Sequence, residues 1–130
     1  MCVERLTTMK ILRFEELEIW KISISIVKEI YDITAIGKFS KDFGLKDQIR
    51  RAAVSISSNI VEGFEKRSNN EFRRFLLISK GSAAEVRNQL FIALAIEYIT
   101  QKDFDKIDKI LIELGGKIGS FVNYLEKTKK

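Results

Sequence analysis

Residues 48–63 read QIRRAAVSISSNIVEG, and this stretch decides the fold. Its apolar residues recur at steps of three and four and share one face of a helix: Ile49, Ala52, Ala53, Ile56 and Ile60. A second, polar line runs beside the first: Gln48, Ser55, Asn59 and Glu62. Ser and Asn weaken a helix that is exposed to water. They fit better where a second backbone approaches closely, so they predict that this helix packs against another.

A similar polar pattern returns at Ser82, Glu85 and Gln89, which again step by three and four. We predict that the two polar stripes meet, with Asn59 and Ser82 in a hydrogen-bonded layer between two helices. Buried polar groups of this kind can fix the register of a helix pair. The alternative is that these side chains face solvent.

Composition favours one helical domain. The chain has 130 residues, no proline and seven glycines, which suits long uninterrupted helices. The single cysteine, Cys2, cannot form an internal disulfide, as expected in a reducing cytoplasm. No apolar run is long enough to span a membrane, and the charged N-terminus has no signal-peptide pattern. We expect a cytoplasmic protein with a tail at residues 1–13 and a bundle domain at residues 14–127.

Four helices are predicted, at about residues 14–34, 42–64 and 68–98, and from a Thr100 cap through Leu125. Ser68 is followed three residues later by Glu71, which is a capping-box pattern, and Gly37 is a candidate terminator after the first helix. Residues 22–26 alternate as ISISI and could form a strand, but helical spacing continues on both sides and favours a helix. Because the connections are short, neighbouring helices should be antiparallel. The predicted fold is an all-α, up-down four-helix bundle.

Each helix carries an apolar stripe that we expect to face the core. On the first helix it is Leu17, Trp20, Ile24, Val27 and Tyr31. On the third it is Phe72, Phe75, Leu76, Ala83, Val86, Leu90 and Ala93, and on the fourth Phe104, Ile107, Leu111, Leu114, Ile118, Phe121 and Leu125. Two helices carry further apolar residues: Ile19, Ile22, Ile26, Ile30 and Ile33 on the first, and Ile78, Phe91, Ile92 and Leu94 on the third. Helices that are apolar most of the way round need a second partner, so we predict a homo-oligomer.

The chain lacks the residues of common catalytic and metal sites. Without histidine it has neither a His-containing zinc site nor the Glu-x-x-His ligands of di-iron bundles. Residues 80–82, KGS, lack the glycine spacing and the strand of a phosphate-binding loop. Glu62 and Glu85 are a weak candidate pair for a cation, and bonds from each to neighbouring Ser, Asn or Arg groups are the favoured interpretation. We therefore expect no enzyme activity, no cofactor and no metal.

Positive charge is the main cue to a partner. The net charge is +5 with a pI near 9.4, and residues 38–74 hold nine Lys or Arg against five Asp or Glu. Such cations attract phosphates. The candidate contacts are Lys46, Arg50, Lys66, Arg67, Arg73, Arg74, Lys80 and Arg87. Three of them, Arg73, Lys80 and Arg87, are spaced by seven and form a line with about 10 Å per step.

Other interpretations of these cations stay open. They can form a solvated helix face, and Arg50 and Arg51 in particular can make ion pairs between subunits. Aromatic residues do not alternate with the basic ones as in single-strand stacking platforms, because Trp20 and Tyr31 lie on the predicted core stripe. Binding would therefore be to phosphates, without strong sequence specificity.

Several stretches together resemble one known family. They are FEEL at 14–17 with Trp20 and Lys21, FGL at 43–45, QIRRAAVSI at 48–56, NIVEG at 59–63 and GSAAE at 81–85. They are similar to the bacterial four helix bundle protein family, also called 23S rRNA intervening-sequence proteins or S23 ribosomal proteins, because some members are encoded inside insertions in 23S rRNA genes. The resemblance covers nearly the whole chain from Phe14. It implies a cytoplasmic four-helix bundle that assembles into a homopentamer.

The resemblance also implies partners. The related accessory variability protein of diversity-generating retroelements is a similar basic pentamer, which binds nucleic acid and works with a reverse transcriptase. By analogy we expect a non-enzymatic oligomer that binds RNA or DNA. The second hypothesis is a protein-interaction scaffold, for example an accessory subunit for a polymerase or reverse transcriptase. The dependence of binding on salt concentration distinguishes the two hypotheses, because phosphate binding weakens steeply as the salt concentration rises and binding through an apolar interface does not.

Overall fold

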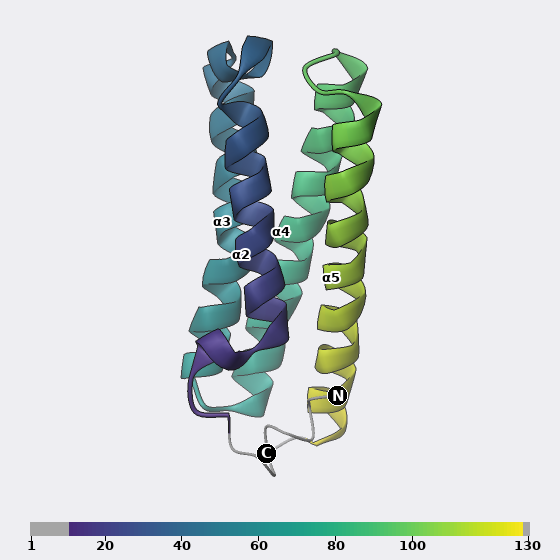
Figure 1. Ribbon diagram of the computed structural model, residues 1–130. Coiled ribbons are helices and arrows are strands. Elements are labelled where there is room, and N and C mark those ends of the chain that lie inside the picture. The colour runs from purple at the N-terminus through teal and green to yellow at the C-terminus, as the bar shows by residue number, and fades with distance from the viewer. Residues whose placement is uncertain (1–10, 129–130) are drawn as a thin grey trace.

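Every element in residues 11–128, the part of the chain that the structure describes, is helical. In this computed structural model the elements are η1 (Phe14–Glu16), α2 (Glu18–Thr34), η2 (Gly37–Lys41), α3 (Phe43–Glu65), α4 (Asn69–Ala95) and α5 (Gln101–Lys127). The four long helices stand side by side, each antiparallel to the next (Figure 1). The predicted four-helix bundle is confirmed, and residues 22–26 lie inside α2 rather than in a strand. None of the described helices is both long and apolar enough to cross a membrane.

The two ends of the bundle carry different connections. The α2–α3 and α4–α5 connections lie at one end, and the α3–α4 turn lies at the other, beside η1 (Figure 1). Most of the predicted tail, residues 1–13, falls outside the described range, and so does Cys2. Where the described residues begin, Ile11 packs against the core and the Leu12 carbonyl accepts a hydrogen bond from Arg67 Nη2 at 2.9 Å.

Side-chain caps begin two of the helices where the sequence places them. At the start of α4, Ser68 Oγ accepts a hydrogen bond from Glu71 N at 3.3 Å. At the start of α5, Thr100 Oγ1 accepts one from Asp103 N at 3.1 Å. These bonds satisfy amide groups that the first turn of a helix leaves without a partner. Gly37, just after α2, has a φ of +61°, a left-handed conformation that favours glycine and turns the chain toward α3.

The first helix begins later than predicted. Leu17 has an extended backbone (φ −74°, ψ 129°), which separates η1 from α2. The break folds Phe14 back against Trp20, with the ring centroids 5.4 Å apart in an edge contact. A continuous helix from residue 14 would carry Phe14 away from this contact.

The buried stripe of α2 is also not the predicted one. The helix buries Ile19, Ser23, Ile26, Ile30 and Thr34. Of the predicted stripe only Leu17 is buried, whereas Ile24 and Tyr31 are exposed. Ser23 and Thr34 can occupy the core because their hydroxyls donate hydrogen bonds within the helix, to the carbonyls of Trp20 at 2.6 Å and Ile30 at 2.7 Å. A prediction of the buried face from hydrophobic spacing alone does not take such hydrogen bonds within the helix into account.

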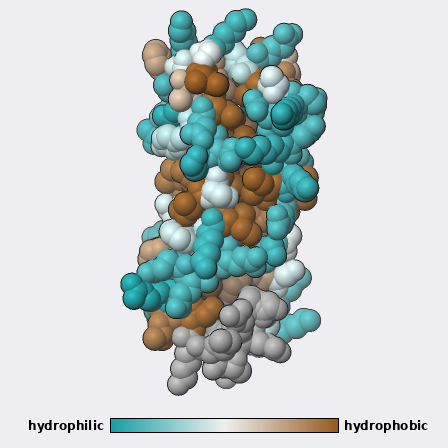
Figure 2. All heavy atoms as spheres, in the orientation of Figure 1, coloured by the Kyte–Doolittle hydropathy of each residue, from teal (hydrophilic) through white to brown (hydrophobic). Residues whose placement is uncertain are grey.

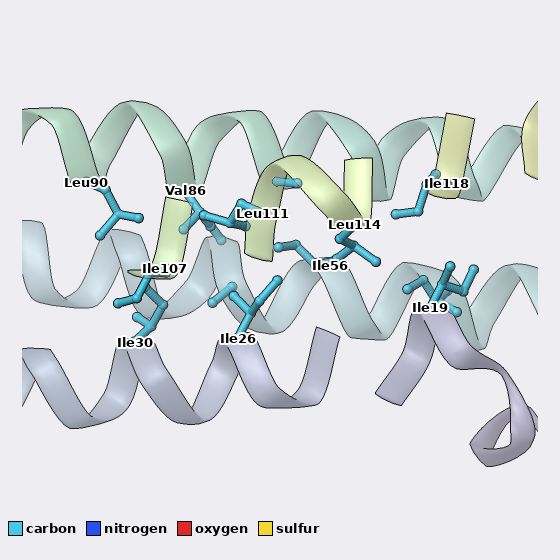
Figure 3. Packing of buried hydrophobic residues seen from close by; sticks show 14 of the residues in the cluster. Ile19, Ile26, Ile30, Ile56, Val86, Leu90, Ile107, Leu111, Leu114 and Ile118 are labelled. Carbon is cyan, nitrogen blue, oxygen red and sulfur yellow. The ribbon is translucent and has the colours of Figure 1, made fainter. Parts of the chain in front are cut away.

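Helices α3, α4 and α5 turn their predicted stripes to the interior. Every residue that we predicted to face the core on these three helices is buried. Figure 3 shows Ile56 of α3, Val86 of α4 and Leu111 of α5 meeting Ile26 of α2 in one continuous core. Burial of apolar area is the main favourable term in folding, so these stripes decide which face each helix turns inward.

Polar side chains line the contact between α3 and α4. Ser55 Oγ lies 2.9 Å from Ser82 Oγ across the contact, and Asn59 Nδ2 donates a hydrogen bond to Ser55 Oγ at 3.0 Å. Ser79 Oγ donates to the carbonyl of Ile56 at 2.8 Å, again between the two helices. The predicted hydrogen-bonded layer is confirmed for Asn59 and Ser82, with Ser55 as the link between them. The two stripes do not meet along their whole length, because Gln48, Glu62 and Glu85 are exposed.

Apolar side chains also remain on the outside of the bundle. The outer face of α4 exposes Leu77, Ile78, Phe91 and Ile92, and three of these belong to the surplus that the sequence predicted. On the face made by α2 and α5, apolar patches lie between bands of polar side chains (Figure 2). A single copy of the chain leaves this area in contact with water.

Candidate nucleic-acid interface

The eight basic residues that the sequence singled out lie in three places. Arg73, Lys80 and Arg87 follow the contact between α4 and α5, Lys66, Arg67 and Arg74 lie at or next to the α3–α4 turn, and Lys46 and Arg50 lie near the start of α3. The α3–α4 turn and the start of α3 are at opposite ends of the bundle (Figure 1). The fold therefore does not gather the eight cations on one surface.

Two of the three cations spaced by seven form ion pairs between α4 and α5. Arg73 Nη1 lies 2.7 Å from Glu126 Oε1, and Arg87 donates two hydrogen bonds to Asp108, at 2.7 and 3.3 Å. Asp108 is only 9% exposed, and its hydrogen bond raises the pKa of Arg87. Lys80, between the two arginines, is exposed. Two of the three cations therefore hold helices together, with a carboxylate of the same chain as counter-charge.

The arginines near the α3–α4 turn lie over aromatic rings. The guanidinium carbon of Arg67 is 4.6 Å from the centroid of Phe64, and that of Arg74 is 4.5 Å from the centroid of Phe75. Arg74 also donates a hydrogen bond to Glu71 at 3.0 Å, which lowers the pKa of Glu71. Both rings are buried, so these arginines cover the edge of the core.

A shallow groove of about 730 Å³ lies beside the same turn. Its lining residues are Phe14, Trp20, Ser57, Ser58, Val61, Glu62, Glu65 and Lys66. Its two carboxylates, Glu62 and Glu65, outnumber its one cation, Lys66, and repel phosphates, so the groove does not suit a nucleic-acid backbone. Within the described residues no three His, Cys, Asp or Glu side chains are grouped so that they could hold a metal ion.

The corner between α2 and α3 is organised by Arg50. Its Nε donates a hydrogen bond to Thr34 Oγ1 at 2.8 Å, and its Nη2 donates to the carbonyl of Tyr31 at 3.3 Å. The last carbonyls of a helix lack partners within the helix, so Arg50 satisfies one of them at the end of α2. Lys46, one turn earlier on α3, donates to the carbonyl of Ser40 at 3.3 Å. Both side chains are thus held at the corner by neutral oxygen atoms, without a carboxylate.

Cations outnumber carboxylates at this corner. Residues 38–51 hold five cations, Lys38, Lys41, Lys46, Arg50 and Arg51, against Asp42 and Asp47. Both carboxylates are engaged. Asp42 accepts hydrogen bonds from Leu45 N at 3.1 Å and from the Tyr98 hydroxyl at 2.8 Å, which lower its pKa, and Asp47 pairs with Arg51 at 2.8 Å. Five cations minus two carboxylates leave a net charge of +3.

Two of these cations, Lys38 and Lys41, were not among the candidates from the sequence. They are exposed and lie three residues apart on η2. A 3₁₀-helix has three residues per turn, so both side chains point the same way. The three-residue spacing of Lys38 and Lys41 was the signal in the sequence that could have identified them. It was not used, because the segment up to residue 40 was expected to be a link without helical periodicity.

A family model described as 23S rRNA-intervening sequence protein matches residues 15–120. The chain belongs to this family. The resemblance found in the sequence is thereby confirmed, and the match includes the whole α2–α3 corner and most of the bundle.

A crystal structure similar to this intervening-sequence family member is that of a protein with unknown function from the S23 ribosomal protein family of Bacteroides thetaiotaomicron. The two chains are 24% identical, with a TM-score of 0.75 over 81% of this chain and 95% of the other. At this identity the likeness shows a common fold. Comparison with curated proteins gives no match.

Proposed function

We propose that this intervening-sequence family protein is a non-enzymatic, cytoplasmic protein that binds RNA phosphates through the α2–α3 corner. The observation that carries the proposal is the excess charge there, since five cations face two carboxylates that already have partners. Cations without a nearby carboxylate can replace the counterions of a phosphate backbone, and this exchange supplies most of the affinity for nucleic acid. DNA offers the same phosphates, and phosphate contacts carry little sequence specificity.

The remaining candidates have smaller parts in this proposal. Arg73, Arg74 and Arg87 are bound to carboxylates of the same chain, which reduces their attraction for phosphate. Lys66 and Lys80 are also exposed, but Lys66 lies at the opposite end of the bundle from the corner and Lys80 lies midway along α4, so we assign them secondary contacts separate from the corner.

Self-association is the second part of the proposal, through the outer face of α4. This face exposes Leu77, Ile78, Phe91 and Ile92. Gly81 lies among them, and outside the nearby backbone of its own helix no described atom is within 4 Å of the position that a Cβ there would take, so another backbone can approach closely. The resemblance to pentameric proteins implies five copies. A ring of copies would repeat the charged corner and strengthen its field.

The test removes the charge of the corner and of a matched control. The corner variant carries Lys38→Gln, Lys41→Gln and Lys46→Gln, and the control variant carries Gln at Lys21, Lys109 and Lys127, which are exposed elsewhere on the bundle. Binding of labelled single-stranded RNA is followed by fluorescence anisotropy over a salt series. For single strands the slope of log K against log salt is about −0.7 per phosphate contact, so losing three contacts should make it shallower by about 2.

The outcomes separate the hypotheses. A shallower slope in the corner variant, with a wild-type slope in the control, supports the corner as the contact surface. Equal slopes in the two variants refute the corner, and a wild type that binds no RNA at low salt refutes the function. Light scattering on the same samples measures the number of copies, and a monomer would refute the association through α4.

A further inference from the structure

Phe43, the first residue of α3, leaves 72% of its surface in water, more than any other large apolar side chain that the structure describes. An aromatic ring usually gains much from burial, so one held in water at the start of a helix is informative. The amine of Lys46 lies 5.2 Å from the ring centroid, in the range of a cation–π contact. The ring adds little to the core and is available to a ligand.

A second exposed aromatic ring lies on α2, beside Arg50 of α3. Tyr31 is 41% exposed, and the guanidinium carbon of Arg50 lies 4.1 Å from its ring centroid. Arg50 is fixed by its hydrogen bonds to Thr34 Oγ1 and to the Tyr31 carbonyl. These bonds use two of the five N–H groups of a guanidinium, so three stay free for another partner. The plane of Arg50 is thus pre-positioned over Tyr31.

The four side chains Phe43, Lys46, Arg50 and Tyr31 form one strip. Phe43, Lys46 and Arg50 recur at steps of three and four, which puts them on the same face of α3, and Arg50 reaches across to Tyr31 on α2. The helix rises by about 10 Å between Phe43 and Arg50. That length corresponds to about three nucleotides stacked at about 3.4 Å each. Tyr31 and Arg50 are 19 residues apart in the chain, which is why the sequence shows no alternation of aromatic and basic residues.

We propose that this strip is a stacking platform for single-stranded RNA. One base stacks on the ring of Phe43 and another on the guanidinium of Arg50, whose opposite face covers Tyr31. Lys46 and the free N–H groups of Arg50 bind the phosphates between them. This inference rests on the RNA binding proposed above and names its ligand. The strand must be single, because the base faces of a duplex are already stacked on one another and cannot reach a side chain.

The surroundings of Phe43 favour a nucleic acid over an apolar protein partner. A partner that covered the ring with apolar groups would also remove water from Lys46 and Arg50, and desolvating a cation without a counter-charge is costly. A nucleotide offers a flat base to the ring and a phosphate to the cations. It therefore satisfies both kinds of side chain at once.

The test distinguishes base stacking on an aromatic ring from nonspecific apolar contact at the same position. Phe43→Leu keeps an exposed apolar side chain but removes the aromatic face, and Phe43→Tyr keeps that face. Labelled oligoadenylate and an RNA duplex with the same number of phosphates are titrated with each full-length variant, and fluorescence anisotropy gives Kd. Ile112→Ala is the control, because Ile112 is a large apolar residue exposed on α5.

We expect Phe43→Leu to raise the Kd for oligoadenylate by about 5- to 150-fold, the range found when one stacked base is lost. Its Kd for the duplex should not change. Phe43→Tyr and Ile112→Ala should bind both RNAs like the wild type. The melting temperature, measured by circular dichroism, should stay at the wild-type value in every variant at position 43, because the ring packs on little else.

The outcomes distinguish this inference from the proposed function. An unchanged oligoadenylate Kd in Phe43→Leu, with a salt slope that is still shallower in the triple lysine variant, overturns the platform and leaves the RNA function standing. A wild type that binds neither RNA at low salt overturns both. A wild type that prefers phosphatidylserine vesicles to oligoadenylate also overturns both, in favour of a membrane surface.

Discussion

The close packing of α3 on α4 depends on the absence of a side chain at Gly63, and Gly63→Ala tests it. A Cβ at this position would lie 2.7 Å from Phe75 Cβ, 3.1 Å from Phe72 Cδ1 and 3.3 Å from the Phe72 carbonyl oxygen. Carbon atoms in contact prefer separations of about 3.5–4.0 Å, so the nearest neighbour must move by about 1 Å. Phe75 Cβ is attached directly to the backbone of α4. The new methyl group therefore pushes the two helices apart near their turn.

Two opposing effects set the size of the change in stability. Alanine is the better helix former by about 1 kcal/mol. Overpacking a core costs about 1–3 kcal/mol, and the upper end applies because the crowded Cβ and carbonyl atoms cannot rotate away. The ring of Phe72 also contacts the rings of Phe64 and Phe121, with centroids 5.9 and 5.2 Å away, so its displacement spreads into the core. We expect Gly63→Ala to lower the free energy of unfolding by about 2 kcal/mol.

Gly116→Ala is the matched control. Gly116 is helical and exposed on α5, and no atom lies within 4 Å of its Cβ position, so alanine there should raise the free energy of unfolding by about 1 kcal/mol. Urea unfolding followed by circular dichroism measures both variants, at one protein concentration because self-association adds to apparent stability. If Gly63→Ala were as stable as Gly116→Ala, the reasoning about the α3–α4 contact would be refuted.

Three further predictions test other contacts. A double-mutant cycle of Ser55→Ala and Ser82→Ala should give a coupling energy of about 0.5–1.5 kcal/mol in urea unfolding, and zero coupling would contradict their hydrogen bond. Arg87→Ala should lower the free energy of unfolding by about 2 kcal/mol, because it leaves the nearly buried carboxylate of Asp108 without its partner; a loss under about 0.5 kcal/mol would mean an ordinary surface pair. Asp42→Asn keeps a helix cap but removes the charge. Folding lowers the pKa of Asp42 below its usual 3.8, so the stabilisation is present above that pH and is lost as the pH falls through the folded-state pKa. The difference in free energy of unfolding between wild type and Asp42→Asn should therefore shrink in acid. A difference that stays constant on acid titration would contradict the proposed stabilisation by the charged Asp42.

The helices α3, α4 and α5 could be predicted closely because their signals are local. Each carries one dominant apolar stripe, and the caps Ser68 and Thr100 bond to amides only three residues away. The hydrogen-bonded layer was also predictable, since Ser and Asn at helical spacing have few other good places. The stripes and the caps depend on residues within one or two turns, which a sequence displays directly, whereas the bond that completes the layer joins Ser55 to Ser82, 27 residues away.

The partners of the basic residues could not be predicted in the same way. Arg87 pairs with Asp108, 21 residues away on another helix, and Arg73 pairs with Glu126 near the end of α5. Counting charges along the chain does not show which cations already have a counter-charge. The structure alone separates the paired arginines of the α4–α5 contact from the cations of the corner.

The sequence by itself determined the class of fold, the approximate ends of the helices and the inward face of three of them, because short-range spacing and capping control these properties. Only the tertiary structure decided the inward face of α2. That helix is apolar on two sides, and its contacts with α3 and α5 select the side that includes Ser23 and Thr34. The same choice leaves Tyr31 outside, under Arg50 of α3. The candidate site therefore depends on long-range packing, which no local pattern in the sequence records.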